Sequence, residues 1–206
     1  MTEGRDFDVV LFDIGGVIVQ MGDIATLGPF SGRSGPADIM KLWLDCPHVD
    51  AHERGAIDAQ EFAQRMTETY AIGCTPDDFL QRCLDWHIGL FSGVEDTIAA
   101  IRPDVRIACL SNTSDFSWRN AAACIAAARL FPTQFLSYRL GMMKPDERIY
   151  RAVADSLGVT PARILFFDDT ERHVVGARHV GLQAHRVAGI DDARVILERY
   201  GLLRKF

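Results

Sequence analysis

The chain has 206 residues, of which 48% are hydrophobic and 24% are charged, and its formal net charge is −6. A chain of this length and apolar content can form a packed core, which excludes a mainly disordered protein and predicts one domain, with or without an insertion. The net negative charge argues against a broad nucleic-acid-binding or anionic-membrane surface, although a few local cations suffice to bind an anionic substrate.

Residues 7–12 are predicted to form the first strand. The apolar run over residues 9–12 is typical of a strand that is buried on both faces in a parallel sheet. Asp13 ends this run, and Gly15 and Gly16 predict a tight turn directly after it. Residues 17–19 then continue the apolar character.

The following segment has helical rather than strand-like periodicity. It predicts helices over residues 36–46, 58–70 and 76–90. Asp58 with Glu61 three residues later predicts a capping box, and Thr75 is predicted to cap a helix that begins with a proline. We therefore expect residues 21–90 to form an all-helical cap inserted after the first strand.

Strands and helices alternate in the remainder of the chain. Helices are predicted over residues 94–101, 118–130, 147–157, 174–180 and 193–200, and strands over residues 105–110, 134–137, 164–167 and 183–187. Such alternation implies a parallel sheet covered by helices on both faces. The predicted fold is α/β, with a Rossmann-like three-layer core of residues 1–20 and 91–206 and the cap of residues 21–90.

Aspartates stand at the ends of two of the predicted strands. Asp13 follows the first apolar run, and Asp168 and Asp169 follow the apolar run over residues 164–167. If these strands are neighbours, the three carboxylates converge at one edge of the sheet, where ligands of such sheets bind. A bound cation would offset the gathered charge, and oxygen ligands suit a hard ion such as Mg²⁺.

Four motifs that carry polar residues lie in order along the chain. They are Val10-Leu11-Phe12-Asp13-Ile14-Gly15-Gly16-Val17, Leu110-Ser111-Asn112-Thr113, Gly141-Met142-Met143-Lys144-Pro145 and Phe166-Phe167-Asp168-Asp169. Together they resemble the haloacid dehalogenase (HAD) superfamily over nearly the whole chain. Among members with a helical cap, the chain most resembles sugar phosphatases of the glucose-1-phosphate phosphatase type, a likeness supported by HERG at residues 52–55 and LGM at residues 140–142.

The resemblance implies a phosphatase that works through an aspartyl phosphate. Asp13 would attack phosphorus, as a carboxylate can near neutral pH without help from a base. Ser111, Asn112 and the main chain at Gly15 would contact the phosphoryl group. Lys144 would bring positive charge to the same oxygens and hold Asp13 ionised.

The same resemblance implies a Mg²⁺ site. Asp13, Asp169 and the main-chain carbonyl of Gly15 would bind the ion, with Asp168 as a further ligand or as the residue that orients Asp169. Phosphatases of this superfamily usually carry a second aspartate two residues after the nucleophile, which acts as general acid and base. Gly15 occupies that position here, and a water held by Asp168 or Thr113, or another group, would have to act instead.

Several residues outside these motifs allow two interpretations. Trp43 and Trp86 in the cap either stack on a sugar or, as we favour, pack between helices. His52 and Arg54 are interpreted as packed or solvated residues, although Arg54 is also a candidate contact for a second anionic group of a substrate. His173 is either a residue that supports the aspartate pair or a direct participant in catalysis.

We therefore predict an enzyme that hydrolyses a small phosphomonoester with Mg²⁺ as cofactor, and we favour a sugar phosphate. The alternatives are a metal-independent 2-haloacid dehalogenase, which Asp168 and Asp169 argue against, and a weakened binding protein, which only Gly15 supports. We expect no nucleic-acid or membrane partner and a monomer or homodimer. Five cysteines without CxxC spacing and a polar N-terminus without a signal peptide predict a cytoplasmic location.

Overall fold

The computed structural model describes residues 7–32 and 35–204 and contains one five-stranded parallel sheet. Its strands are β1 (Val9–Phe12), β4 (Arg106–Ser111), β5 (Thr133–Leu136), β6 (Ile164–Asp168) and β7 (Gln183–Arg186). Their spatial order is β5-β4-β1-β6-β7. The predicted α/β class with a parallel sheet is therefore confirmed. The first six residues, which carried the prediction that no signal peptide is present, lie outside the described residues.

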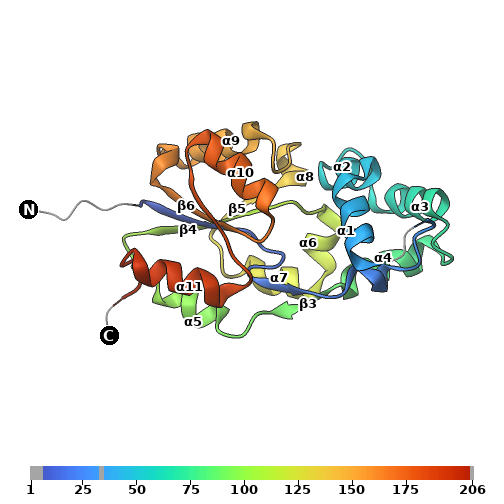
Figure 1. Cartoon of the computed structure of the whole chain (residues 1–206), viewed down its shortest axis with the longest axis horizontal. Coiled ribbons are helices and arrows are strands. Elements are labelled where there is room, and N and C mark those ends of the chain that lie inside the picture. The colour runs from blue at the N-terminus through green and yellow to red at the C-terminus, as the bar shows by residue number, and fades with distance from the viewer. Residues whose placement is uncertain (1–6, 33–34, 205–206) are drawn as a thin grey trace, which may run out of the picture.

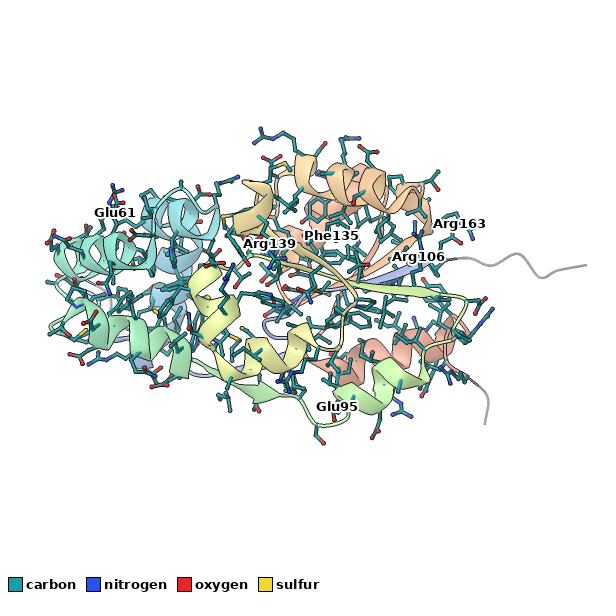
Figure 2. The ribbon with its side chains drawn as sticks, turned by 180° about the vertical axis from the view of Figure 1, so that it is seen from behind. Glu61, Glu95, Arg106, Phe135, Arg139 and Arg163 are labelled. Atoms are coloured by element: carbon teal, nitrogen blue, oxygen red, sulfur yellow. The ribbon has the colours of Figure 1, made fainter. Side chains whose placement is uncertain are left out.

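Helices cover both faces of this sheet and make the core a three-layer structure (Figure 1). The helices α5 (Val94–Ala100), α7 (Ala122–Ala128) and α11 (Ile190–Arg199) pack on one face, and α9 (Glu147–Leu157) and α10 (Glu171–Val180) pack on the other. The alternate residues of β1 divide between the two hydrophobic clusters, with Phe12 in one and Leu11 in the other. The side chains that fill these layers include Phe135, which is labelled in Figure 2.

The register of the central strands brings their carboxyl ends to one edge. Leu11 of β1 lies opposite Ala108 of β4 on one side and opposite Phe166 of β6 on the other. Asp13, which directly follows β1, therefore stands between the ends of its two neighbouring strands. Arg106 and Arg163 mark the opposite end of the sheet, away from the helical segment (Figure 2).

Residues between β2 (Val19–Met21) and β3 (His87–Leu90) form a second helical body beyond one end of the sheet (Figure 1). It consists of the 3₁₀ helix η1 (Ile24–Leu27), α1 (Pro36–Asp45), α2 (Pro47–Glu53), α3 (Ala59–Tyr70) and α4 (Pro76–Asp85). It has its own hydrophobic cluster, in which Phe62 and Phe79 are buried. The domain boundaries at residues 20/21 and 90/91 stay a prediction.

Asp58 and Thr75 cap the helices that the sequence predicted them to cap, but the capping box predicted for Asp58 and Glu61 does not form, because the Glu61 carboxylate pairs with Arg65. The Asp58 side chain accepts a hydrogen bond from the Glu61 N–H at the start of α3, and Thr75 forms a capping box with Asp78 before α4. These caps satisfy N–H groups that have no partner within the first turn of a helix. The first turns of α3 and α4 are therefore capped by residues that the sequence identifies.

The prediction of a helix up to residue 90 is wrong. α4 ends at Asp85, and residues 87–90 form β3, which pairs antiparallel with β2 so that Val19 lies opposite Leu90. The Trp86 indole N–H donates to the Gly22 carbonyl at 2.8 Å and joins the two chain segments at the base of this pair. Pairing with a strand distant in the sequence therefore overrode local helical periodicity.

The predicted single helix over residues 118–130 is two helices, α6 (Asp115–Asn120) and α7. Ala121 between them is extended, with φ −73° and ψ 122°, although alanine is a strong helix former. The short α8 (Ser137–Leu140) and α2 were not predicted either. Among the described helices, none is both long enough and apolar enough to cross a bilayer, and all five cysteines are free thiols.

Candidate active site

A cavity of about 640 Å³ opens at the carboxyl ends of the central strands, against the helical body. Its core wall contains Asp13, Gly15, Ser111, Asn112, Lys144 and Asp169. Its opposite wall contains Trp43, His52, Glu53, Arg54, Phe62 and Trp86. Except for Asp168, which lies behind this wall, every site residue expected from the sequence thus faces one space.

Lys144 holds two of the carboxylates together. Its ammonium Nζ lies 2.8 Å from Asp13 Oδ1 and 2.6 Å from Asp168 Oδ2, and the residue is only 2% exposed. Burial lowers the pKa of Lys144, but the carboxylates of Asp13 and Asp168 raise it above its ordinary value. The ammonium is therefore charged and serves as the fixed cation of the site.

Asn112 fixes the main chain of Lys144. The Asn112 side-chain amide donates from Nδ2 to the Lys144 carbonyl at 3.0 Å, and its Oδ1 accepts from the Lys144 N–H at 2.9 Å. This reciprocal pair ties the end of β4 to the loop that carries the lysine. A phosphate contact from Asn112 stays a prediction, as does one from Ser111, which is buried at the end of β4 and lines the cavity.

Asp13 presents one free carboxylate oxygen. Its Oδ1 accepts hydrogen bonds from the Ile14 N–H at 2.7 Å and from the Lys144 ammonium, while its own N–H donates to the Phe167 carbonyl at 2.8 Å. Among the described residues, none donates to Asp13 Oδ2. Burial and the neighbouring Asp168 and Asp169 carboxylates raise the pKa of Asp13 above its ordinary value, against the opposing effect of Lys144.

Asp168 is the most completely bonded carboxylate of the site. It accepts from the Lys144 ammonium, from the Thr170 N–H at 2.9 Å, and from His173 Nδ1 at 3.0 Å. Burial raises the pKa of Asp168, but Lys144 and the hydrogen bond from His173 outweigh burial and hold it below its usual range. Asp168 therefore orients the lysine and the following loop.

The Asp169 carboxylate points toward Gly16, in the turn that follows β1. Its Oδ1 accepts from the Thr170 hydroxyl at 3.0 Å, and its carbonyl accepts from the Arg186 side chain at 2.9 Å. Its Oδ2 lies so close to Gly16 that a Cβ at that position would be 2.3 Å away. Gly16 also has φ +73°, a conformation that glycine adopts without strain. Glycine at position 16 is therefore required by both backbone and space.

These residues supply a donor set that fits a magnesium ion. Asp13 Oδ2, Asp169 Oδ2 and the Gly15 carbonyl are hard oxygen atoms, and no described residue donates a hydrogen bond to any of them. Three carboxylates face a single ammonium, so a cation would balance the remaining buried charge. Asp13, Asp168 and His173 also offer ligand atoms within 4.8 Å of one another, but Asp168 and His173 already bond each other.

The cap residues that the sequence left open are all part of the cavity wall. Trp43 and Trp86 contact each other edge to face at 5.4 Å between ring centroids, and His52 stacks on Phe62 at 4.3 Å. The guanidinium of Arg54, the C-cap residue of α2, forms an ion pair with Asp50 of that helix at 2.8 Å. These contacts favour packing for the aromatic residues, while their exposed edges still line the cavity.

Glu53 of this site, and Ser137, which contacts its main chain, were not assigned a role from the sequence. Glu53 is half-buried in the cavity wall, and burial raises its pKa to about 7. The fully buried Ser137 hydroxyl donates to the Glu53 carbonyl at 2.6 Å and accepts from the Thr113 N–H at 2.9 Å. Ser137 thus joins the cap to the loop after β4, a contact between segments far apart in the sequence.

Sequence comparisons place known phosphatases among the relatives of this chain. A family model described as haloacid dehalogenase-like hydrolase matches residues 7–181. A phosphatase of Mycobacterium tuberculosis is 33% identical over 150 residues, which cover 70% of this chain and 68% of that protein. A D-ribitol-5-phosphate phosphatase of Bacteroides thetaiotaomicron is 27% identical over 188 residues, which cover 84% of this chain and 88% of that protein.

The fold is also found among solved structures. A HAD-family enzyme of Bacteroides thetaiotaomicron, crystallised with magnesium and inorganic phosphate, superposes with a TM-score of 0.70. The match covers 88% of this chain and 95% of that chain at 22% identity. At this identity the likeness establishes a shared fold.

Proposed function

This chain belongs to the haloacid dehalogenase-like hydrolases, and from that premise we propose that it is a Mg²⁺-dependent phosphatase of a small phosphomonoester. The observation that carries the proposal is the meeting of Asp13, Lys144 and the Asp168-Asp169 pair at one edge of the sheet. A nucleophilic carboxylate, a fixed cation and further carboxylates are the groups that phosphoryl transfer requires. The phosphatases among its relatives act on the class of substrate that these groups suit.

The proposed reaction has two steps, both at Asp13. A carboxylate oxygen of Asp13 attacks phosphorus, and the leaving alcohol departs as an aspartyl phosphate forms. Water then attacks the same phosphorus and releases inorganic phosphate. Lys144 holds Oδ1 of Asp13 at 2.8 Å and so orients the attacking oxygen while adding positive charge beside the phosphoryl group.

Magnesium is the cofactor we propose. Asp13, Asp169 and the Gly15 carbonyl would hold it, with Asp168 in support, and the ion would screen the repulsion between the nucleophile and the anionic phosphate. The oxygen donor set supports this assignment, and the structural relative crystallised with magnesium and phosphate is consistent with it. Asp168 serves in this proposal as the residue that orients Lys144 and the loop before α10.

The substrate we favour is a sugar or polyol phosphate. The relative that acts on D-ribitol 5-phosphate supports this class, and the cavity of about 640 Å³ has room for a molecule of that size. The wall opposite the nucleophile combines aromatic rings with Arg54 and Glu53, and so offers both stacking and polar contacts. The narrower resemblance to glucose-1-phosphate phosphatases, a cytoplasmic location and a monomeric or homodimeric state stay predictions.

A panel of phosphorylated sugars, polyols, nucleotides and small acids, assayed with Mg²⁺ and with a chelator, tests the proposal. We expect phosphate release from at least one ester that depends on Mg²⁺, and a loss of at least about 10³-fold in Asp13→Asn. Asp155→Asn, on the outer part of α9, is the matched control and should keep full activity. Retained turnover in Asp13→Asn would overturn the assignment of the nucleophile.

The same assay separates the alternatives. Chloride release from 2-chloropropionate in the presence of chelator would identify a metal-independent dehalogenase. A folded protein that turns over no phosphate ester under any condition would identify a binding protein. Either result would contradict the proposed function.

A further inference from the structure

The site lacks an aspartate two residues after the nucleophile, and the described residues near Asp13 offer few substitutes. Asp168 is fully bonded, and its low pKa leaves it without a proton at neutral pH. The Thr113 hydroxyl is too weakly acidic to replace a carboxyl group. His173 Nε2 is buried away from solvent, and burial lowers the pKa of this imidazole. A proton donor must therefore come from elsewhere in the cavity wall.

Glu53 is placed to fill this role. It ends α2 and lines the same cavity as Asp13 and Lys144. The Glu53 carbonyl accepts a hydrogen bond from the Ser137 hydroxyl. That hydroxyl also lies within hydrogen-bond distance of the Thr113 carbonyl, in the loop after β4. The Glu53 main chain is therefore fixed to the core, close to the loop that would surround a phosphoryl group.

The Glu53 carboxyl is chemically available as well as fixed. Among the described residues, none forms a hydrogen bond or an ion pair with its side chain, whereas Asp50 one turn earlier is paired with Arg54. Gly55 allows the cap segment that carries Glu53 to pack closely against the core, because a Cβ at this position would lie 2.8 Å from the Tyr138 carbonyl oxygen. Only a glycine two residues after Glu53 lets the cap segment lie this close to the core.

We propose that Glu53 is the general acid and base of this site, an inference that rests on the proposed phosphatase function. As a carboxylate oxygen of Asp13 bonds to phosphorus and the P–O bond to the leaving group breaks, the Glu53 carboxyl gives its proton to the leaving oxygen. The resulting carboxylate then takes a proton from the water whose oxygen attacks phosphorus. The bond between phosphorus and Asp13 breaks, and Glu53 ends the cycle protonated.

The charge environment of Glu53 suits this cycle. Burial raises its pKa to about 7, while Lys144 and Arg172 lower the pKa and Asp50 raises it. Arg54 adjoins Glu53 in sequence but is paired with Asp50. Near neutral pH the protonated and ionised forms are therefore both populated, which a group that gives and then takes a proton requires.

The substitution Glu53→Gln, assayed on two leaving groups, tests the proposal. With an alkyl phosphate, whose alcohol needs a proton to leave, we expect kcat/KM to fall by about 10²–10⁴-fold. With p-nitrophenyl phosphate, whose phenolate leaves without a proton, kcat/KM should change little. The variant should instead show a burst of nitrophenolate, because the aspartyl phosphate forms normally but hydrolyses slowly.

The pH profile gives a second readout that a structural role would not produce. In the wild-type protein, kcat/KM for the alkyl phosphate should fall as pH rises through about 7, because the acid must be protonated. Glu53→Gln should lack this decline. Glu53→Asp, which keeps the proton but shortens the side chain, should recover part of the lost activity.

Glu61→Gln is the matched control, since Glu61 is a cap glutamate on the outer edge of α3 (Figure 2). It should keep the wild-type rates on both substrates. Equal losses on both substrates in Glu53→Gln, or wild-type rates on both, would overturn the proposal while phosphatase activity stands. Failure of the wild-type protein on every ester with Mg²⁺ would instead contradict the proposed function.

Discussion

Asp168 behind the core wall and Glu53 in the cap wall are carboxylates of opposite kinds. Behind the core wall, Asp168 accepts hydrogen bonds from a lysine, a histidine and a main-chain N–H, and its pKa lies below the usual range. On the cap wall, no described residue pairs with the side chain of Glu53, and burial raises its pKa to about 7. Asp168 thus keeps a permanent charge beside Lys144, and the cap holds a carboxyl group that can change its protonation state.

The difference follows from how each wall is built. The core carboxylates stand at the ends of neighbouring parallel strands, where main-chain and side-chain donors converge on them. Glu53 stands at the end of a short helix, in a wall made mainly of apolar and aromatic side chains. The core wall supplies donors that stabilise a charged carboxylate, whereas the cap wall shields the Glu53 carboxyl group from water.

Removal of the Lys144 ammonium should have the largest effect on both stability and activity. Lys144→Met leaves Asp13 and Asp168 buried without their ammonium, so we expect the protein to lose about 3–5 kcal/mol of unfolding free energy, as when one partner of a buried ion pair is removed. Phosphatase activity should fall to background. Lys41→Met, on the exposed part of α1, is the matched control for denaturant unfolding and for activity. Equal effects of the two substitutions would contradict the role given to Lys144.

A substitution at Gly16 should weaken the core wall without removing a charge. Gly16→Ala places a methyl group against Asp169 Oδ2, and we expect the apparent Mg²⁺ affinity to fall by about 10–100-fold, as for other changes that misplace a metal ligand. Gly73→Ala is the matched control, because Gly73 has a similar φ of +74° but nothing near its Cβ position. Both variants carry backbone strain, so only Gly16→Ala should alter the Mg²⁺ dependence of turnover. Similar Mg²⁺ titrations for both would show that Asp169 does not bind the ion.

The smallest effect is expected for Glu53→Gln in the cap wall. This variant should be more stable to thermal unfolding than the wild-type protein, but only at high pH. The pKa of Glu53 is raised from 4.5 to about 7 by folding, so its contribution to stability is present below pH 4.5 and is lost as pH rises through about 7. Glu53→Gln removes this loss, and at pH 8 its Tm should exceed that of the wild-type protein by about 2–4 °C, which corresponds to about 1 kcal/mol. At pH 4 the two Tm values should agree. A gain at pH 4 as large as that at pH 8 would exclude ionisation of Glu53 as the cause.

Sequence reasoning predicted the core better than the cap for a physical reason. The buried strands β1 and β6 are continuous apolar runs that end at aspartates, a pattern that requires no knowledge of partners. The strand β3 was mistaken for helix, because its identity depends on pairing with β2, which lies far from it in the sequence. Ala121 shows the same limit, since its extended backbone opposes its helical propensity.

The site divides in the same way. Asp13, Lys144 and Asp169 could be named from motif order alone, and the structure brings them to one cavity. The pairing of Asn112 with the Lys144 main chain and the isolation of Glu53 depend on burial and on contacts between distant segments. Contacts between residues that are far apart in the chain cannot be predicted from the pattern of a single sequence.

The antiparallel pair β2–β3 has a consequence for how this protein can change. The chain leaves the core through β2 and returns through β3, so the two ends of the intervening segment are held side by side whatever its length. For the core, this segment is equivalent to the loop of a hairpin, and each doubling of a flexible loop adds only about 0.6 kcal/mol of closure entropy. Insertions, deletions or grafts in the cap should therefore cost the core little, which would allow substrate preference to diverge around unchanged reaction chemistry.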